Sequence, residues 1–392
     1  MKKIYYITAV FATLFLVGCG DGIDLPGVNV ETDLNKIPLP DNNVNLEQVE
    51  LKPSTEPMLH EGLHTEEDFQ RIRDKKAAGE EPWVSAYQLL VESQFSQKTA
   101  DTYPTEWIKR GVSGDENYMN AARGATIAYQ QALRWKIEQD DEYAAKAVEN
   151  LNKWVQTCVG VTGNTNLSLA AGLYGYEFAI AGELLRDYEG WDRADFAAFQ
   201  NWLLKVFYPA NDDFLKRHHD TNALHYWANW CLCNIAAKMA IGIVTDRRDI
   251  YNEGIDHLQT GDTNGRLRRA IYHDYAPDYN FAQWQESGRD QGHTLMCVGL
   301  MGVICQLAWS QGDDFFAYDD NLFMRACEYA ACCNYTNETV PYTTYIWQKQ
   351  SQWGYPIPEE QTTLGGGKWI KRAIWALPYY HYKGVKDISD DN

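Results

Sequence analysis

The stretch Gln285–Trp309 reads QESGRDQGHTLMCVGLMGVICQLAW, a dense polar segment followed directly by a long apolar run. From Thr294 onward nearly every residue is apolar, which is typical of a helix buried on all sides. The segment before it carries two carboxylates, a guanidinium, two amides and an imidazole. A solvated helix start does not need so varied a set, whereas a site for an anionic ligand does. The spacing predicts a helix over Gly288–Gln311 with Arg289 and His293 on one face.

Most of the remaining chain shows apolar residues at three- and four-residue spacing, which predicts further helices. Strand signals are sparse and are clearest in Gly265–Tyr275 and Val340–Trp347. Helices joined by short connections pair antiparallel, and no repeat of fixed period is present. We therefore expect an all-α chain folded as an (α/α) toroid of helical hairpins, in preference to a right-handed solenoid. The other predicted helices are one capped by Thr65, then Glu81–Phe95, Tyr118–Glu138, Glu142–Cys158, Leu167–Tyr188, Arg193–Val206, Asn222–Thr245, Ile250–Thr260, Asp320–Asn334 and Lys368–Tyr382.

The N-terminus has the pattern of a targeting segment. Lys2 and Lys3 precede an apolar run that is too short for a stable membrane span, and Leu16-Val17-Gly18-Cys19 is similar to the bacterial lipobox. We expect residues 1–19 to be a lipoprotein signal peptide with Cys19 as the lipidated residue. Residues 20–58 are rich in Asp, Asn and Pro and predict a flexible tether, and residues 59–392 predict one toroid domain. The protein is thus expected to be exported and anchored by lipid to the bacterial envelope.

The net charge and the aromatic content indicate which kinds of ligand the protein could bind. The formal net charge is −19 with 14 Trp and 25 Tyr. An acidic surface argues against nucleic acid, and aromatic side chains serve sugar faces as well as cores. No GxSxG, P-loop, dinucleotide or HExxH motif is present, and the adjacent His218 and His219 point in different directions, so we expect no cofactor and no metal. The cysteines after Cys19 lack zinc-type spacing and are expected to be buried thiols, with one or two disulfides left open.

Other polar and aromatic residues accompany the Gln285–His293 segment. Asn222–Trp230 reads NALHYWANW and would place His225 and Asn229 on one helical face, with Trp230 beside them. If one end of the toroid gathers the long loops, they would line a cleft suited to an anionic sugar chain. Each group also has a structural interpretation, as a helix start with a satisfied Asn, a capped helix with a Glu286–Arg289 pair, or packed tyrosines. The loops are 212–220 with Lys216, Arg217, His218 and His219; 274–286 with Tyr275, Tyr279, Trp284 and Gln285; and 337–367 with Tyr342, Tyr345, Trp347, Lys349, Trp353 and Tyr355.

Several strings together resemble the alginate-lyase-like superfamily of polysaccharide lyases. They are Asn229-Trp230, ESGRDQGH at Glu286–His293, AWSQGDD at Ala308–Asp314 and VPY at Val340–Tyr342. The resemblance covers about Leu59 to Lys386, and ESGRDQGH is similar to an exported bacterial branch. It implies an incomplete (α/α) toroid and β-elimination of a uronate polysaccharide such as alginate, polymannuronate or glucuronan. Better-known alginate lyases carry Asn-Asn-His before Tyr-Trp, whereas Asn222-Ala223-Leu224-His225-Tyr226-Trp227 lacks that Asn-His pair.

By motif position the resemblance implies roles for Asn229, His293 and a tyrosine, Tyr342 or Tyr345. β-Elimination removes the proton next to a uronate carboxylate, so the charge of that carboxylate must be neutralised. We predict that Asn229, His293 and Arg289 neutralise it without metal and that Tyr342 is the acid/base, provided that cations lower its pKa. The predicted substrate-binding residues are His225, Trp230, Gln285, Glu286, Tyr345, Lys349, Trp284 and Tyr275.

Two other classes of function are left open at this point. One is a glycoside hydrolase on the same scaffold that uses Glu286 and Asp290 as its two carboxylates. The other is a non-catalytic, glycan-binding lipoprotein. In each case we expect a monomer whose partners are an anionic polysaccharide and, through the lipid, a membrane.

Overall fold

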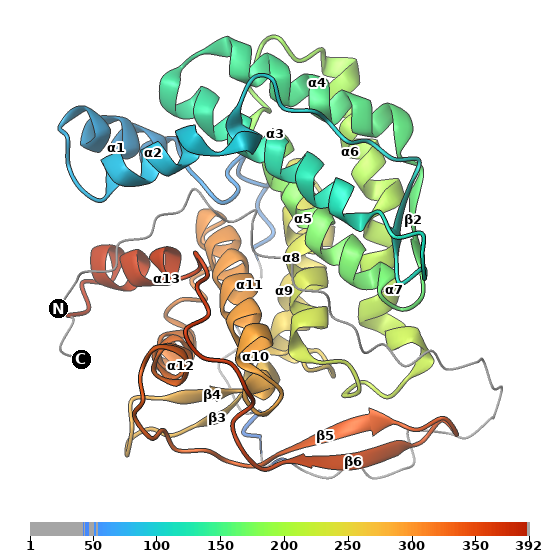
Figure 1. The fold of residues 1–392 in the computed structure, drawn as a ribbon, viewed down its shortest axis with the longest axis vertical. Helices are drawn as coiled ribbons and strands as arrows, with labels where there is room; N and C mark the ends of the chain where they lie inside the picture. The colour runs from blue at the N-terminus through green and yellow to red at the C-terminus, as the bar shows by residue number, and fades with distance from the viewer. Residues whose placement is uncertain (1–41, 43, 47–50, 52–53, 390–392) are drawn as a thin grey trace.

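A computed structural model describes residues 42, 44–46, 51 and 54–389. The predicted signal peptide and Cys19 lie outside the described residues. Helices dominate the structure, and the few strands form two-stranded pairs (Figure 1). The α-helices are α1 (Glu66–Ala77), α2 (Trp83–Glu92), α3 (Tyr118–Glu138), α4 (Asp141–Thr157), α5 (Leu167–Leu184), α6 (Arg193–Val206), α7 (Tyr208–Arg217), α8 (Ala228–Val244), α9 (Arg248–Thr260), α10 (Leu267–Ala270), α11 (Gln291–Ser310), α12 (Tyr318–Tyr335) and α13 (Ala376–Tyr380), with a π-helical turn η6 (His381–Val385).

The strands pair in three places. β1 (Trp107–Arg110) and β2 (Gly160–Gly163) are parallel, whereas β3 (Ile271–Asp274) with β4 (Ala282–Trp284), and β5 (Tyr345–Gln350) with β6 (Pro356–Gln361), are antiparallel. Short 3₁₀ turns complete the description, namely η3 (Gln94–Ser96), η4 (His218–Asp220) and η5 (Gln285–Gly288).

The long helices form antiparallel hairpins in two layers. α5 packs between α3 and α8, and α8 packs in turn against α11, so these four helices form the inner layer. The helix that follows each inner helix runs back outside it, as α4, α6, α9 and α12 do. Within the described residues α3 and α11 do not pack extensively against each other, so the ring of hairpins is open there. The structure therefore confirms the predicted fold, an incomplete (α/α) toroid.

The inner helices owe their position to side chains that are apolar all round. Every residue of α8 is buried, and α5 is buried from Ser168 to its end. α11 is long and apolar enough to cross a membrane, but 78% of its apolar window is buried inside the fold, so it is a core helix. Small residues bring the helices close: a side chain at Gly172 of α5 would meet Cys233 Sγ of α8 at 2.4 Å.

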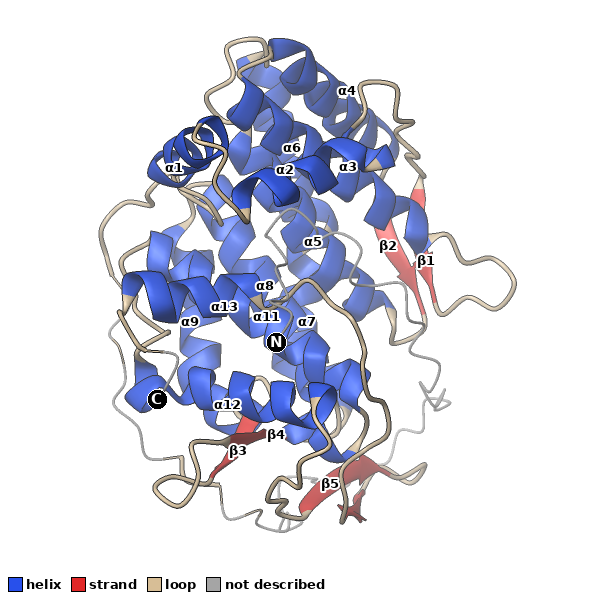
Figure 2. Ribbon diagram, turned by 60° about the vertical axis from the view of Figure 1, so that its left-hand side comes forward, coloured by secondary structure: helices blue, strands red, loops and turns tan. Residues whose placement is uncertain are grey.

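All four inner helices begin at the same end of the toroid, because each is preceded by a helix or loop that returns the chain to that end. The β3–β4 and β5–β6 pairs lie there too, at the lower end in Figures 1 and 2. Helix N-termini carry partial positive charge and unpaired N–H groups. This end of the toroid, called the N-terminal end below, is thus suited to an anionic ligand.

Several predicted boundaries are wrong in ways that matter for the site. α8 begins at Ala228 rather than Asn222, and α11 begins at Gln291 rather than Gly288. His225 and Asn229 therefore do not share a helical face, and neither do Arg289 and His293. The predicted loop 212–220 is largely helix α7, stabilised by Lys216–Asp212 and Arg217–Asp213 pairs at four-residue spacing. The predicted helix Lys368–Tyr382 begins only at Ala376, and the strand predicted over Gly265–Tyr275 starts with α10.

Part of the segment predicted as a tether is held against the domain. Side chains of α9 and α11 bind its backbone along an extended path that we call the N-terminal strap, residues 51 and 54–64. Gln259 pairs with both backbone groups of Leu51, and Arg248 donates to the carbonyls of Glu56 and Pro57. Gln311 likewise binds Leu59 at both backbone groups. These contacts are not those of a free linker, and the domain start at residue 59 stays a prediction.

The cysteines match the expectation of buried thiols. The described cysteines after Cys19 are all free, and only Cys332 is partly exposed. The described residues thus contain no disulfide.

Candidate active site

Glu286 is the centre of the polar segment and is completely buried. Its Oε1 atom accepts hydrogen bonds from the backbone N–H of Asn229 at 3.0 Å and from the Asn229 side-chain amide at 2.5 Å. Its Oε2 atom pairs with Arg289 at 3.2 Å. The neighbouring Gln285 accepts from the N–H of Ala228 at 3.0 Å. Gln285 and Glu286 thus cap α8, whose own N-cap residue offers no side-chain bond.

Arg289 sits above this buried pair and reaches the surface of the site. Its side chain is 20% exposed, and the guanidinium carbon lies 5.1 Å from the ring centre of Trp227. Trp227 stacks on Trp347 of β5 at 5.0 Å, and Trp347 stacks on His225 at 5.8 Å. Lys349 lies 5.5 Å from the Trp347 ring. These partly exposed residues form a wall of alternating cations and aromatic rings, called the cation–aromatic wall below, which suits a chain of charged sugars.

His225 belongs to this wall as a neutral ring. Its Nδ1 accepts from the backbone N–H of Gln350 at 2.8 Å. Burial lowers the pKa of His225 to about 4, and the nearby Lys349 acts in the same direction. The cations of the wall are therefore Arg289 and Lys349, and Lys349 is paired with Glu359 at 3.3 Å.

Asp290 and His293 form a second polar pair beside Arg289. Asp290 is the N-cap of α11: its Oδ1 accepts from the His293 backbone N–H at 2.8 Å, and its Oδ2 bonds to His293 Nδ1 at 2.5 Å. Burial acts to raise the pKa of Asp290, but the bonds from His293 and the nearby Arg289 guanidinium hold that pKa below its ordinary value. Asp290 is thus an ionised carboxylate bonded to an imidazole.

The two candidate tyrosines lie in different surroundings. Tyr345 is buried and its hydroxyl is 3.4 Å from Asn264 Oδ1. Tyr342 is partly exposed, and its hydroxyl donates to the carbonyl of Gln361 at 2.9 Å. That hydroxyl lies so close to Gly288 that an added Cβ would come within 2.3 Å of it. Tyr342 therefore borders the polar segment at Gly288, whereas Tyr345 is bonded to Gln285 at the start of that segment.

Burial raises the pKa of Tyr342 to about 12, with a smaller contribution from Tyr275. The expectation that cations lower this pKa is therefore not met.

Gln283 holds the loop that contains Tyr342, since its amide oxygen accepts from the Tyr275 hydroxyl at 2.5 Å and from the Thr343 N–H at 2.9 Å.

Arg110 is a further cation that sequence reasoning passed over. It ends β1, is buried, and lies 4.7 Å from the ring centre of Tyr118. Among the described residues it forms no ion pair, and its Nη1 atom has no hydrogen-bond partner. A buried guanidinium without a carboxylate is costly, and an anionic ligand would supply that carboxylate. No signal in the sequence marks it, because Asp115 and Glu116 lie as near to Arg110 as to Lys109 along the chain.

The geometry agrees with the comparisons. The sequence model of a family described as "Alginate lyase" matches residues 72–338, more than half of the chain. The chain belongs to the alginate lyase family. It is therefore a polysaccharide lyase. No curated protein sequence matches it.

Solved alginate lyases share the fold of this lyase. A histidine-to-alanine variant of alginate lyase A1-III complexed with tetrasaccharide has a TM-score of 0.53 at 15% identity, over 68% of this chain and 75% of that one. A tyrosine-to-phenylalanine variant of A1-III, also complexed with tetrasaccharide, has a TM-score of 0.52 at 15% identity, over 68% and 76%. An alginate lyase from Bacteroides ovatus has a TM-score of 0.50 at 15% identity, over 68% and 81%. At such identities the likeness concerns the fold.

Two predicted substrate contacts of the lyase lie in the core. Trp284 is fully buried and donates to the carbonyl of Ala326, and Trp230 packs among Phe214 and Tyr226. Neither ring presents a face to substrate. Because α8 starts later than predicted, the tryptophan that faces the site is Trp227.

The other predicted site residues fall into two groups: buried residues that hold α8 in place, and partly exposed residues. Asn229, Gln285 and Glu286 are fully buried and hold α8 to the polar segment. Arg289, His293 and Lys349 are partly exposed, with side-chain exposures of 20%, 15% and 33%. Tyr275 is half-buried, with its hydroxyl bound to Gln283. The structure thus brings the two polar stretches together through Glu286 and Asn229, with the buried members underneath.

The burial of Glu286 also decides against the hydrolase alternative. Its carboxylate oxygens are enclosed and bound to Asn229 and Arg289, so it cannot protonate a glycosidic oxygen. Within the described residues, no three His, Cys, Asp or Glu side chains are grouped to hold a metal ion. The prediction of metal-independent chemistry stays a prediction.

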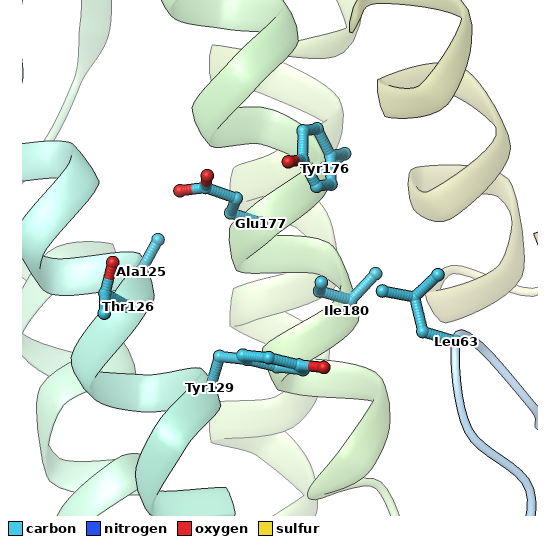
Figure 3. Close-up of a pocket in the computed structure, with 7 residues that line it drawn as sticks. All are labelled: Leu63, Ala125, Thr126, Tyr129, Tyr176, Glu177 and Ile180. Carbon is cyan, nitrogen blue, oxygen red and sulfur yellow. The ribbon is translucent and has the colours of Figure 1, made fainter. Parts of the chain in front are cut away.

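A small cavity lies elsewhere in the toroid. It is enclosed by α3, α5 and Leu63 of the N-terminal strap (Figure 3). Its lining is mostly apolar, apart from Glu177, whose Oε2 atom has no partner among the described residues. Burial raises the pKa of Glu177 well above its ordinary value. The cavity has no cation, so it does not match the chemistry of the site.

Proposed function

We propose that this lyase cleaves a uronate-containing polysaccharide of the alginate, polymannuronate or glucuronan type by metal-independent β-elimination at the cation–aromatic wall. The observation that carries the proposal is the position of Arg289. Its guanidinium lies over Trp227 with one hydrogen bond to Glu286, so most of its N–H groups remain to bind a carboxylate. The N-termini of the inner helices add positive potential at the same end.

In this proposal Arg289 neutralises the uronate carboxylate, which makes the neighbouring C–H acidic enough to lose its proton. Asn229 has an indirect role, because its amide is committed to Glu286. The neutralising roles predicted from sequence thus reduce to Arg289, with Asn229 and Glu286 fixing α8 against it.

The tyrosine pKa decides how the proton moves. With a pKa of about 12, roughly one Tyr342 in 10⁵ is ionised at neutral pH, so Tyr342 is a poor base. A histidine has an ordinary pKa of about 6.5 and is half neutral near that pH. We therefore assign proton removal to His293 and proton donation to Tyr342, both of which adjoin the Gly288–Gln291 backbone.

The step then balances. The C–H electron pair next to the carboxylate forms the new C=C bond, and its proton goes to His293. The bond to the 4-linked oxygen breaks, its electron pair stays on that oxygen, and the oxygen takes the proton of Tyr342. The product carries an unsaturated, ultraviolet-absorbing end.

The test is to incubate the protein with alginate, polymannuronate, polyguluronate, glucuronan and glycosaminoglycans while following ultraviolet absorbance. We expect absorbance to rise with a uronate polymer and to stay flat with His293→Ala. Tyr342→Phe should lower turnover ~10²-fold or more, whereas Tyr345→Phe is the matched control and should retain most of it. New reducing ends without absorbance would contradict the elimination, and full turnover by Tyr342→Phe would contradict the assignment of the acid.

We also propose that the protein is exported, lipid-anchored through Cys19 and active as a monomer without nucleic acid. The support is the lysine pair, the apolar run and the Leu16–Cys19 string. Cys19→Ser should move the protein from the membrane fraction to the soluble fraction of a bacterial host. An unchanged distribution would contradict the anchor.

A further inference from the structure

Asp290 makes two separate bonds to one residue. Its Oδ1 atom caps α11 by accepting the backbone N–H of His293, and its Oδ2 atom bonds to Nδ1 of the same side chain. An ionised carboxylate only accepts hydrogen bonds. The imidazole nitrogen that faces Asp290 must therefore carry the proton.

The backbone of Asp290 is itself clamped by the Gly365–Gly367 segment. The N–H of Gly365 donates to the Ser287 carbonyl at 2.8 Å, and the N–H of Gln291 donates to the Gly366 carbonyl at 2.9 Å. A Cβ on Gly365 would lie 2.5 Å from the Asp290 backbone nitrogen, so only glycine permits this approach. The clamp holds the capping residue, and with it the imidazole, in one place.

We propose that Asp290 is a positioning residue that locks His293 in the Nδ1–H form, so that Nε2, on the side of the ring away from Asp290, carries the lone pair that accepts the substrate proton. The inference deepens the proposed function and rests on His293 as the base. A carboxylate that orients an imidazole through Nδ1–H is the arrangement that hydrolase triads use for the same purpose.

The simpler interpretation is that Asp290 only caps the helix. Asp, Asn and Ser are all good N-caps, which allows the two roles to be separated. Asp290→Asn keeps a capping oxygen, but its amide offers N–H to Nδ1 and so favours the opposite tautomer. Asp290→Ser keeps a capping hydroxyl with no group that reaches the ring.

A matched control is available at another helix. Asp192 caps α6 by accepting from the N–H groups of Ala194 and Asp195, and no histidine is bonded to it among the described residues. Asp192→Asn therefore removes a capping carboxylate of the same type away from the site. It should leave turnover unchanged.

The experiment measures the full-length protein in two ways. The nitrogen chemical shifts of His293 report its tautomer in the free enzyme, and ultraviolet absorbance on the best uronate polymer reports kcat and KM. We expect the wild type to be Nδ1–H, and Asp290→Asn to shift toward Nε2–H with kcat lower by ~10²-fold or more. The melting temperature and KM should change little, and Asp290→Ser should lose the fixed tautomer.

The result that overturns the proposal is an Asp290→Asn variant with the wild-type tautomer, or with the shifted tautomer and kcat within about threefold of wild type. A wild-type protein that produces no unsaturated ends from any polymer would instead contradict the proposed function. In that case the nitrogen shifts still decide whether Asp290 fixes His293, so the two failures are distinguishable.

Discussion

The same five-residue pattern occurs at both ends of the toroid with opposite results. Glu183–Asp187 at the end of α5 and Glu286–Asp290 before α11 both read Glu-x-x-Arg-Asp, and both form an ion pair three residues apart. Arg186 fills its donors, with bonds to Glu183, to Asp246 and to the carbonyls of Ile243 and Val244. Arg289 donates one bond among the described residues. The pair at Arg186 is saturated, whereas Arg289, which also lies 3.9 Å from Asp290 Oδ2, keeps donors that bind the substrate carboxylate in the proposed function.

Surroundings explain the difference. Arg186 lies where α8 ends, beside carbonyls that need donors, and its side chain is 8% exposed. Arg289 lies where α8 and α11 begin, beside N–H groups that offer no acceptor, and its side chain is 20% exposed. The same motif thus meets carbonyl acceptors at the C-terminal end of α8 and helix N–H groups at the N-terminal end.

The largest expected effect on stability is at the saturated pair. Arg186→Ala leaves Glu183 buried without its cation and uncaps two carbonyls of α8, so we expect the free energy of unfolding to fall by ~3–5 kcal/mol. Urea unfolding measures it, and Arg186→Lys, which keeps the charge but loses the fork geometry, should lie in between. Turnover per folded molecule should be retained. If Arg186→Ala unfolded at the same urea concentration as wild type, the Arg186–Glu183 pair would not have the structural role that we assign to it.

At the unsaturated pair the effect should appear in turnover. Arg289→Ala should lower kcat/KM by ~10²–10³-fold, because it removes the group that neutralises the substrate carboxylate. Its loss of stability should be smaller than that of Arg186→Ala, since Glu286 keeps its bonds to Asn229. Turnover by ultraviolet absorbance and stability by urea unfolding should be measured for Arg186→Ala and Arg289→Ala. We expect the first variant to lose mainly stability and the second to lose mainly turnover. If Arg289→Ala were the less stable protein and still turned over, the comparison would be reversed.

The smallest expected effect on stability is at Glu177. This buried carboxyl group, unlike Glu183 and Glu286, has no arginine partner among the described residues. Its pKa is raised by burial, so its stabilising contribution is complete below its unfolded pKa and is lost as the pH rises through the folded value. Glu177→Gln cannot ionise and should differ from wild type by less than ~1 kcal/mol in acid. Urea unfolding at acidic, neutral and alkaline pH should show the variant gaining on wild type as the pH rises. A constant difference would mean that Glu177 does not titrate.

Local sequence was sufficient for the fold. The unbroken apolar runs of α8 and α11 predicted core helices, and the bounds of α3 and α6 were correct to the residue. The start of α8 was missed because its cap comes from Gln285 and Glu286, more than fifty residues away. Helix α7 was missed although its Lys216–Asp212 and Arg217–Asp213 spacing is a helical signal.

The sequence indicated which residues gather at the candidate site, but it did not indicate which of them are buried and which are exposed. That Asn229 and Arg289 belong together could be inferred from their strings, but Glu286 lying between them, fully buried, could not. Which residues are buried and which are exposed here depends on where α8 starts. The predicted start was six residues too early, and Trp230 was therefore chosen in place of Trp227. Arg110 was missed because its unpaired state is a property of three-dimensional neighbours.

The route of the chain before the N-terminal strap has a consequence for where the enzyme works. Asn42 exchanges two side-chain hydrogen bonds with the backbone of Ile346 in β5, so the chain joins the body beside the cation–aromatic wall. With Cys19 lipidated as proposed, 23 residues separate the anchor from that point, a number that even fully extended spans at most ~80 Å. The anchored segment would therefore reach the toroid at the end that carries the cation–aromatic wall and not at the opposite end. The end of the toroid where we propose that uronate polymers are cleaved would then lie within that distance of the membrane.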